Sequence, residues 1–422
     1  MKISTRIPAL EGGTPTKKSF LVFGRPKITN AEIREVIDTL KSGWIGTGPK
    51  TALFEQKIAS YTNAKYAVAL NSCTAGLHLS LLACGVKPND EVITTPMTFA
   101  ATVNVIEHVG AKPIFADVDR SSMNIDPKNI EKHISSKTKA VIPVHMAGRP
   151  CNMDYIHRIA KKHNIRVIED AAHALGATYK GKPIGSLSDT TVFSFYVTKN
   201  LTTSEGGMVT TNNKDIADFI RIYSLHGLNK GAWKRYSESG FKNYVVEAPG
   251  YKYNMTDIQA SIGLAQFKEF HNNQNRRKQI WNIYMEQLKD LPLYLPSEIE
   301  SNTTHAYHLF TILLNLDSLR VNRDYIQSAL CAENIGIGTH FIAVHLHPYY
   351  QKKYGFSYGS FPNAEWISER TISIPLSADM SSKDVTDTIT ALRKVLTYYR
   401  SHSGRRGKNL QPSLSNILQT HH

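Results

Sequence analysis

Residues 167–211 read VIEDAAHALGATYKGKPIGSLSDTTVFSFYVTKNLTTSEGGMVTT. An apolar run ends in the acidic pair Glu169 and Asp170, and a second β-type run, residues 191–196, leads to Lys199. A carboxylate and a lysine therefore each follow a buried strand. In an open α/β sheet, ligands bind at the edge where the strands end, so this stretch predicts a functional site at that edge.

Short apolar strands alternate with amphipathic helices before this stretch. The strands read YAVAL, EVITT, PIFADV, AVIPVH and RVIED. This order predicts an α/β fold with a mostly parallel central sheet and helices on both faces. Right-handed crossovers would bring the carboxyl end of every strand to one edge of the sheet. We expect this large domain to span residues 31–270, after an N-terminal segment, residues 1–30.

The character of the sequence changes after Pro292. Strands such as AYHLFTILL, and a Gly-rich strand that ends at His340, are mixed with helices. This pattern predicts a smaller C-terminal α+β domain over residues 271–400. The remaining residues, 401–422, are polar and basic and predict a disordered tail.

The composition is that of an ordinary globular protein, with 41% apolar and 20% charged residues. Apolar runs are shorter than a membrane span and the N-terminus lacks a secretory core, so we expect a cytoplasmic protein without membrane insertion. The net charge of +15 is spread along the chain, which favours a solvated basic surface; attraction of an anionic small molecule is the alternative. The cysteines are scattered, so we expect no metal site. They are Cys73, Cys84, Cys151 and Cys331.

A phosphate could bind where the first strand meets the following helix. Residues 71–76 read NSCTAG, and they place the hydroxyls of Ser72 and Thr74 and the backbone of Ala75 at a helix start. Backbone N–H groups and the helix dipole suit a phosphate there. Simple N-capping by Ser72 or Thr74 explains the same residues equally well.

Other candidate residues follow neighbouring strands. Phe99 could belong to the core or stack on a flat cofactor. His173 could be a satisfied core residue, and Ser194 alternates with two phenylalanines. A lysine, a carboxylate, an aromatic ring and a phosphate cradle are together the parts of a pyridoxal 5′-phosphate site. The lysine binds the cofactor aldehyde, and the carboxylate keeps the pyridine nitrogen protonated.

The same segments carry a family resemblance over about residues 20–398. EDAAHALG, WIGTGP, NSCTAGLHL, PVHMAG, GYKYNMTDIQA, HAYHLF and PNAEWISERTISIPLSADM resemble the DegT/StrS-type nucleotide-sugar aminotransferases, which are fold type I pyridoxal-phosphate enzymes. Within the family, the order of EDAAHA, GYKYN and EW–SER is similar to the UDP-4-amino-4-deoxy-L-arabinose aminotransferase branch. The departures are Cys73, where small residues are common, Val197, where proline is frequent, and a C-terminal extension.

The resemblance implies a role for each residue around the cofactor. Lys199 would bind the cofactor and move the substrate proton, and Asp170 would pair with the pyridine nitrogen. Phe99 would stack on the ring, and His173 would lie beside the phenolic oxygen. The phosphate would be bound by Ser72, Thr74, Ala75 and Ser194.

The resemblance also implies a homodimer with shared active sites. Asn254 would reach the phosphate from a neighbouring subunit, although Asn254 or Thr256 could instead cap the next helix. Trp44 and His340 would belong to the sugar-nucleotide pocket, again with partner contributions. A family branch with His in place of Lys199 performs sugar 3-dehydration, so the lysine favours amination.

We therefore expect an aminotransferase that moves an amino group from L-glutamate to the C4 keto group of a UDP-linked sugar. One alternative keeps the cofactor but acts at C3 or on a dTDP- or GDP-linked hexose. An alternative of another class is a non-catalytic regulatory or nucleic-acid-binding protein that uses the basic surface. The sequence contains no helix-turn-helix motif in its favour.

Overall fold

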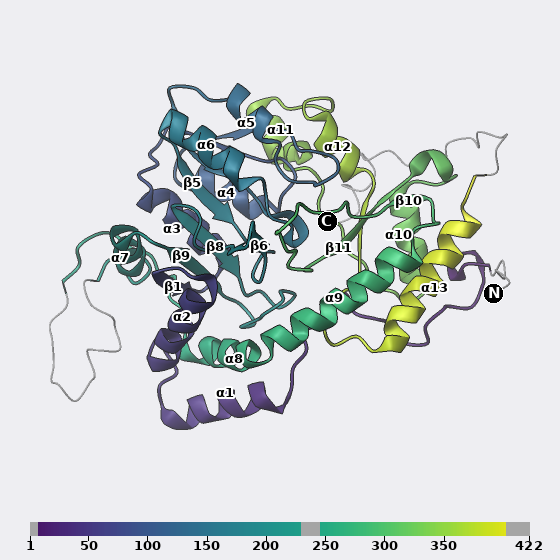
Figure 1. Ribbon diagram of the computed structural model, residues 1–422, viewed down its shortest axis with the longest axis horizontal. Helices are drawn as coiled ribbons and strands as arrows, with labels where there is room; N and C mark the ends of the chain where they lie inside the picture. Colours follow the sequence, from purple (N-terminus) through teal and green to yellow (C-terminus); the bar gives the residue numbers. More distant parts are fainter. Residues whose placement is uncertain (1–6, 229–244, 402–422) are drawn as a thin grey trace.

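The computed structural model describes residues 7–228 and 245–401, and its main feature is a seven-stranded sheet (Figure 1). The strand order is β1-β9-β8-β5-β4-β2-β3. The strands are β1 (Tyr66–Leu70), β2 (Glu91–Thr94), β3 (Lys112–Phe115), β4 (Thr138–Ile142), β5 (Arg166–Asp170), β8 (Thr190–Ser194) and β9 (Gly207–Thr211). The predicted α/β fold with a mostly parallel sheet is confirmed. Residues 402–422 of the expected tail lie outside the described residues.

The strand β9 runs against its neighbours, which corrects the expectation that every strand ends at one edge. It is antiparallel to both β1 and β8. The connection from β8 to β9 contains no helix, whereas a parallel return is usually made through a helical crossover. The amino end of β9 therefore lies at the edge where β1 and β8 end, and Gly207 pairs with both Leu70 and Ser194.

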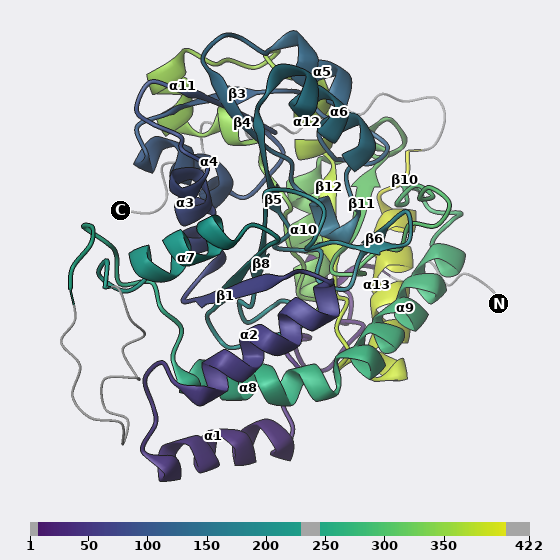
Figure 2. The ribbon, with the colours of Figure 1, turned by 60° about the vertical axis from the view of Figure 1, so that its left-hand side comes forward.

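Helices cover both faces of the large sheet (Figure 2). Alternation along β5 sends Val167 to one face and Ile168 to the other. The first face packs against α2 (Pro49–Thr62), α5 (Pro127–Lys132), α6 (Met153–His163) and α8 (Asp257–Lys268). The second face packs against α3 (Cys73–Ala83), α4 (Ala100–His108) and α7 (Lys214–Tyr223). The helix α1 (Asn30–Ser42) lies along α8.

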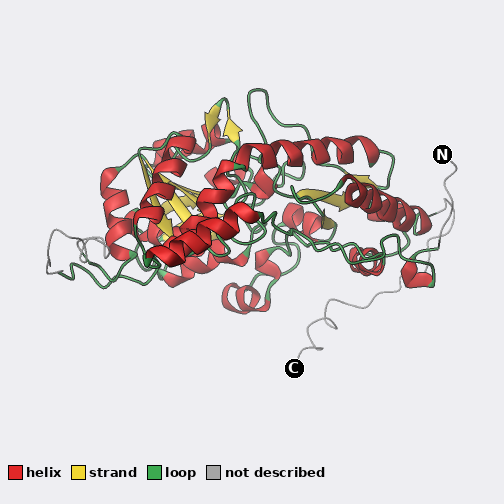
Figure 3. Ribbon diagram, turned by 90° about the horizontal axis from the view of Figure 1, so that it is seen from below, coloured by secondary structure: helices red, strands yellow, loops and turns green. Residues whose placement is uncertain are grey.

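A second, three-stranded antiparallel sheet forms in the C-terminal part, apart from the large sheet (Figure 3). Its strands are β10 (Leu293–Tyr294), β11 (Phe310–Leu314) and β12 (Thr371–Ile374). They share a core with α9 (Phe270–Gln287), α10 (Arg323–Ala332) and α13 (Ser382–Tyr398). The smaller elements are the hairpin β6 (Thr178–Tyr179) and β7 (Lys182–Pro183), with α11 (Pro348–Tyr354) and α12 (Pro362–Ser368). The expected domain boundary at residue 270 falls at the start of α9.

The Gly-rich segment that leads to His340 is not a strand, contrary to the prediction. It makes two isolated bridges, from Ile335 to Leu21 and from Gly338 to Ser373. Glycines weaken a regular strand, and a Cβ on Gly336 would lie 2.5 Å from the carbonyl oxygen of Leu21. The N-terminal segment therefore packs closely against this part of the chain.

No helix within residues 7–228 and 245–401 has the length and apolar character needed to cross a bilayer.

Candidate active site

Lys199 and Asp170 follow two neighbouring parallel strands. Asp170 is the last residue of β5 and pairs with Val192 of β8, and Lys199 lies in the turn after β8. The N–H of Lys199 donates to the carbonyl oxygen of Tyr196 at 2.9 Å. Burial lowers the pKa of the Lys199 amine to about 8, although Cys73 and Asp170 oppose that shift. An amine with this pKa can exchange a proton near neutral pH.

The carboxylate of Asp170 is buried and held at both oxygens. Thr102 of α4 donates from Oγ1 to Oδ2 at 2.7 Å, and the N–H of Ala172 donates to Oδ1 at 3.1 Å. Burial raises the pKa of Asp170, whereas these two hydrogen bonds and the charge of Lys199 favour the ionised form. The residue before it, Glu169, faces the opposite side of the sheet, where it bonds His145 at 2.8 Å. Strand alternation therefore gives only one member of the acidic pair to this site.

His173 and His340 lie near each other, with ring centroids 6.4 Å apart. Nδ1 of His173 accepts the N–H of Ala147 at 3.2 Å, so the proton of the neutral ring is on Nε2. Burial holds the pKa of His173 well below its usual range and lowers that of His340 to about 4. The ring of Phe341 stacks on His173 at 6.1 Å. His340 thus lies beside His173 of the same chain.

The predicted phosphate residues meet where α3, β8 and β9 converge. Ser72 caps α3, because its Oγ accepts the N–H of Ala75 at 3.1 Å, and Thr74 lies in the same first turn. Ser194 is buried at the end of β8 beside Gly207. A Cβ on Gly207 would lie 2.4 Å from the carbonyl carbon of Ser72. Glycine is therefore required to bring these groups together.

Phe99, Asn254 and Trp44 lie on surrounding loops. Phe99 is 64% exposed and its ring is 6.1 Å from that of Phe341. Asn254 bridges to Leu70 at the end of β1, and its Nδ2 donates to Oγ1 of Thr47 at 2.6 Å. Thr256, rather than Asn254, caps α8.

The loop that carries Trp44 is held against the start of α8. The N–H of Asp257 donates to the carbonyl oxygen of Gly46 at 2.7 Å, and the Asp257 carboxylate accepts the N–H groups of Gly48, Lys50 and Thr51. The Trp44 loop and Asn254 therefore lie side by side at the carboxyl edge of the sheet.

Comparison with known proteins agrees with this geometry. The model of the DegT/DnrJ/EryC1/StrS aminotransferase family matches residues 26–393. The spore coat polysaccharide biosynthesis protein SpsC of Bacillus subtilis is 48% identical over 381 residues, which are 90% of this chain and 98% of that protein. The chain belongs to the DegT/DnrJ/EryC1/StrS aminotransferase family.

Solved structures of sugar aminotransferases share the fold. The PMP-form of Spr1654 from Streptococcus pneumoniae has a TM-score of 0.84 at 36% identity, with 89% of this chain and 99% of that chain covered, and its PLP-form is also similar. DesI, solved in the presence of its TDP-sugar product, has a TM-score of 0.81 at 31% identity, with 92% and 95% covered. This DegT-family enzyme is therefore a fold type I, pyridoxal-phosphate-dependent sugar aminotransferase.

The residues of the site suit this cofactor. The buried carboxylate of Asp170, which two donors orient, can face a protonated ring nitrogen. Lys199, whose pKa is lowered, follows the neighbouring strand at the same edge of the sheet. The close approach of Gly207 to the start of α3 leaves backbone rather than side chain beside Ser72 and Ser194. When bound, pyridoxal phosphate supplies an electron sink for the substrate carbon.

Sequence reasoning missed four residues that the structure places at the candidate site. Thr102, Asn200, His308 and Phe341 contact the predicted residues or each other. HAYHLF carried the family resemblance, but nothing in its spacing places His308 beside His173. Asn200 follows Lys199 directly, and only the folded chain shows its partners.

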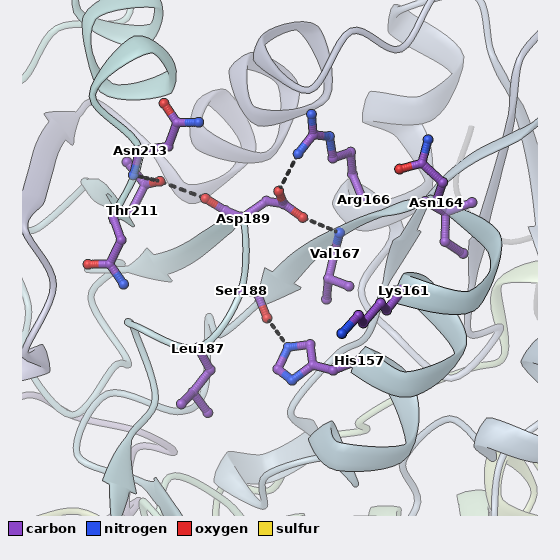
Figure 4. A pocket seen from close by; sticks show the side chains of 13 residues that line it. His157, Lys161, Asn164, Arg166, Val167, Leu187, Ser188, Asp189, Thr211 and Asn213 are labelled. Carbon is purple, nitrogen blue, oxygen red and sulfur yellow. Dashed lines mark hydrogen bonds and ion pairs between the residues drawn. The ribbon is translucent and has the colours of Figure 1, made fainter.

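A cleft of about 710 Å³ (Figure 4) is lined by Arg166 at the start of β5 and Thr211 at the end of β9, so it lies at the edge of the large sheet opposite the candidate site. Asp189 bonds Arg166 at 2.8 Å and the N–H of Val167 at 2.9 Å, and His157 bonds Ser188 at 2.8 Å. The polar groups of its lining therefore largely satisfy one another. Lys199 and Asp170 are not among its lining residues, so the cleft is separate from the candidate site.

Proposed function

We propose that the enzyme transfers an amino group from L-glutamate to the C4 keto group of a UDP-linked 4-keto sugar, for a cell-surface or lipopolysaccharide sugar. The net exchange converts glutamate and the keto sugar into 2-oxoglutarate and the amino sugar. The observation that carries the amination chemistry is that Asp170 ends β5 and Lys199 follows the neighbouring parallel strand β8, which brings both side chains to one edge of the sheet. The C4 position and the UDP group rest on the similarity of EDAAHA, GYKYN and EW–SER to the arabinose branch.

Each residue has a role in this proposal. Lys199 binds the cofactor and moves the proton at the substrate carbon, and Asp170 keeps the ring nitrogen protonated. Phe99 covers the ring, and His173 lies beside the phenolic oxygen with its proton on Nε2. The phosphate is held by Ser72, Thr74, Ala75 and Ser194. The N–H of Ala75 now bonds Ser72, so phosphate binding requires that donor to be shared or redirected.

The functional unit in this proposal is a homodimer with shared sites, in which Asn254 serves the partner's cofactor and Trp44 and His340 line the sugar-nucleotide pocket. Two features support a subunit contact. The helix α1 exposes Ile33, Ile37 and Leu40 at helical spacing, and the Phe99 ring is exposed beside the site.

A panel of nucleotide sugars tests the substrate. The 4-keto and 3-keto sugars linked to UDP, dTDP and GDP are each incubated with the enzyme and glutamate, and 2-oxoglutarate is measured. Turnover confined to a UDP-4-keto sugar is expected. Preference for a 3-keto or dTDP-linked sugar would replace this substrate assignment and leave the aminotransferase assignment intact. The dTDP alternative is retained because DesI was solved with a TDP-sugar product.

The Lys199→Ala variant tests the site itself. It should show no turnover and no cofactor trapped by borohydride, whereas the wild-type chain should retain the label on Lys199. Turnover by the variant would refute the role of Lys199. The alternative of a non-catalytic, nucleic-acid-binding protein is disfavoured by the family assignment.

A further inference from the structure

Asn200, the residue after Lys199, is buried at the meeting point of three segments. Its Nδ2 donates to the carbonyl oxygen of Ala306 at 2.6 Å and to Oε1 of Gln274 at 3.0 Å. Its Oδ1 contacts Nδ1 of His308 at 3.1 Å. The side chain thus links the turn of the reactive lysine to α9 and to the segment that enters β11.

These contacts determine the state of His308. Both Nδ2 contacts of Asn200 are to oxygen atoms, so the amide nitrogen donates and Oδ1 accepts. Nδ1 of His308 must therefore carry the proton and donate to Asn200. Gln274 is consistent with this arrangement, because its Nε2 donates to the carbonyl oxygens of Ala306 and Leu175.

His308 is also fixed relative to His173. The rings are 4.5 Å apart at 40°. Both histidines bond the backbone of Ala147. The N–H of Ala147 donates to Nδ1 of His173, and the carbonyl oxygen of Ala147 accepts the N–H of His308. A second backbone bond, from Ala306 to Gly148 at 2.9 Å, holds the segment in place.

We propose that Asn200 and His308 are positioning residues for Lys199. The hydrogen bond from Nδ1 of His308 orients the Asn200 amide, and the amide holds the main chain that carries the lysine. This inference rests on the proposed role of Lys199. The position of the amine relative to the cofactor and the substrate then depends on a side chain far away in the sequence.

Two substitutions separate this role from packing. In His308→Asn, the amide nitrogen can occupy the place of Nδ1 and keep the bond to Asn200, but the ring volume is lost. In His308→Gln, more volume is kept and the polar group moves to the place of Nε2. If packing decides, the Gln variant should be the better enzyme; if the bond to Asn200 decides, the Asn variant should be.

The test uses full-length protein loaded with pyridoxal phosphate. We expect His308→Asn to keep kcat within about threefold of wild type despite a lower thermal stability, and His308→Gln to lose about tenfold in kcat with KM nearly unchanged. The pH midpoint of the visible absorption of the lysine-bound cofactor should shift in the Gln variant by about half a unit or more and stay in place in the Asn variant. A Gln variant like wild type, or equal loss in both variants, overturns the proposal.

A third variant keeps the proposal testable if His308→Gln does not fold. Gln274→Ala removes one acceptor of Asn200 from α9 without altering any residue proposed to contact the cofactor. Gln274→Ala should shift the absorption midpoint in the same direction as His308→Gln does. If His308→Gln does not fold, the shift in Gln274→Ala relative to wild type is the test. An unchanged midpoint in Gln274→Ala overturns the proposal. Failure of the proposed function is distinct, because the wild-type chain itself would then carry no borohydride-trapped cofactor on Lys199.

Discussion

Thr102 donates a hydrogen bond from Oγ1 to Oδ2 of Asp170 at 2.7 Å, which joins α4 to the end of β5. Burial raises the pKa of Asp170, and this bond is the first of the contacts that favour its ionised form. The hydroxyl of Thr98 bonds Thr102 at 2.8 Å. The ionisation of Asp170 thus depends on α4, a helix that lies outside the segment containing Glu169 and Asp170.

Thr102→Val should weaken the site while keeping its shape. Loss of the donor raises the pKa of Asp170 further, so a larger share of the carboxyl is neutral and unable to hold a protonated ring nitrogen. We expect a loss of about tenfold in kcat, measured by steady-state kinetics, and weaker cofactor binding, measured by absorbance titration. Thr102→Ser keeps the hydroxyl and should stay near wild type. Equal behaviour of the Val and Ser variants would show that the hydrogen bond is unimportant.

Gly207→Ala should disrupt the convergence of α3, β8 and β9. Its Cβ would lie 2.4 Å from the carbonyl carbon of Ser72 and 2.5 Å from the nitrogen of Cys73, and backbone cannot rotate away as a side chain can. We expect a stability loss of about 1–3 kcal/mol or more, with weaker cofactor binding. Denaturant unfolding and cofactor titration measure both. Gly46→Ala is the matched control, since among the described residues no atom apart from those of its two chain neighbours lies within 4 Å of its Cβ.

Much of the frame could be predicted from the sequence because its signals are local. The bounds of β1 and β5 agree with the predicted strands YAVAL and RVIED, and the ends of parallel strands had to bring Asp170 and Lys199 to one edge. The direction of β9 was missed because strand pairing depends on the connection, which periodicity does not report. The sequence predicts a strand before His340 because no local pattern shows that its glycines make a close backbone contact with the N-terminal segment.

The remaining site residues depend on contacts between distant parts of the chain. His308 lies beside His173 only because residues 147 and 148 bind the segment before β11. No local pattern encodes that contact. Asn254 illustrates the same limit, since its place beside Leu70 is visible only in the fold, and its role toward a partner subunit stays a prediction.

The pH dependence of cofactor capture should report the Lys199 amine. Burial lowers its pKa from 10.5 to about 8, and the neutral amine is the reactive form. The rate at which the apo-protein forms its visible absorption with pyridoxal phosphate should therefore rise with pH through a midpoint near that value. Nα-acetyl-lysine amide, measured alongside, corrects for titration of the cofactor. A midpoint near the ordinary lysine value would contradict the burial of the amine.

Asp170→Asn should move that midpoint in a defined direction. The Asp170 carboxylate opposes the lowering of the Lys199 pKa, because a nearby negative charge favours the ammonium form. Its removal should therefore place the midpoint below that of the wild-type protein, even though the variant binds cofactor less tightly. A midpoint that moves upward would show that Asp170 does not act on Lys199 through its charge.

Hybrid dimers can show which chain's site Asn254 serves. Asn254→Asp keeps the size of the side chain but repels a phosphate, so its homodimer should have little activity, and Lys199→Ala should have none. If Asn254 acts on the partner, a dimer of one chain of each variant contains one site with both Lys199 and Asn254 intact. Co-expression in equal amounts should then restore about a quarter of wild-type activity, because about half of randomly paired dimers are hybrids. If Asn254 acts within its own chain, where it lies beside Leu70 and Thr47, every site in the hybrid carries a defect and the mixture should be no more active than the separate variants.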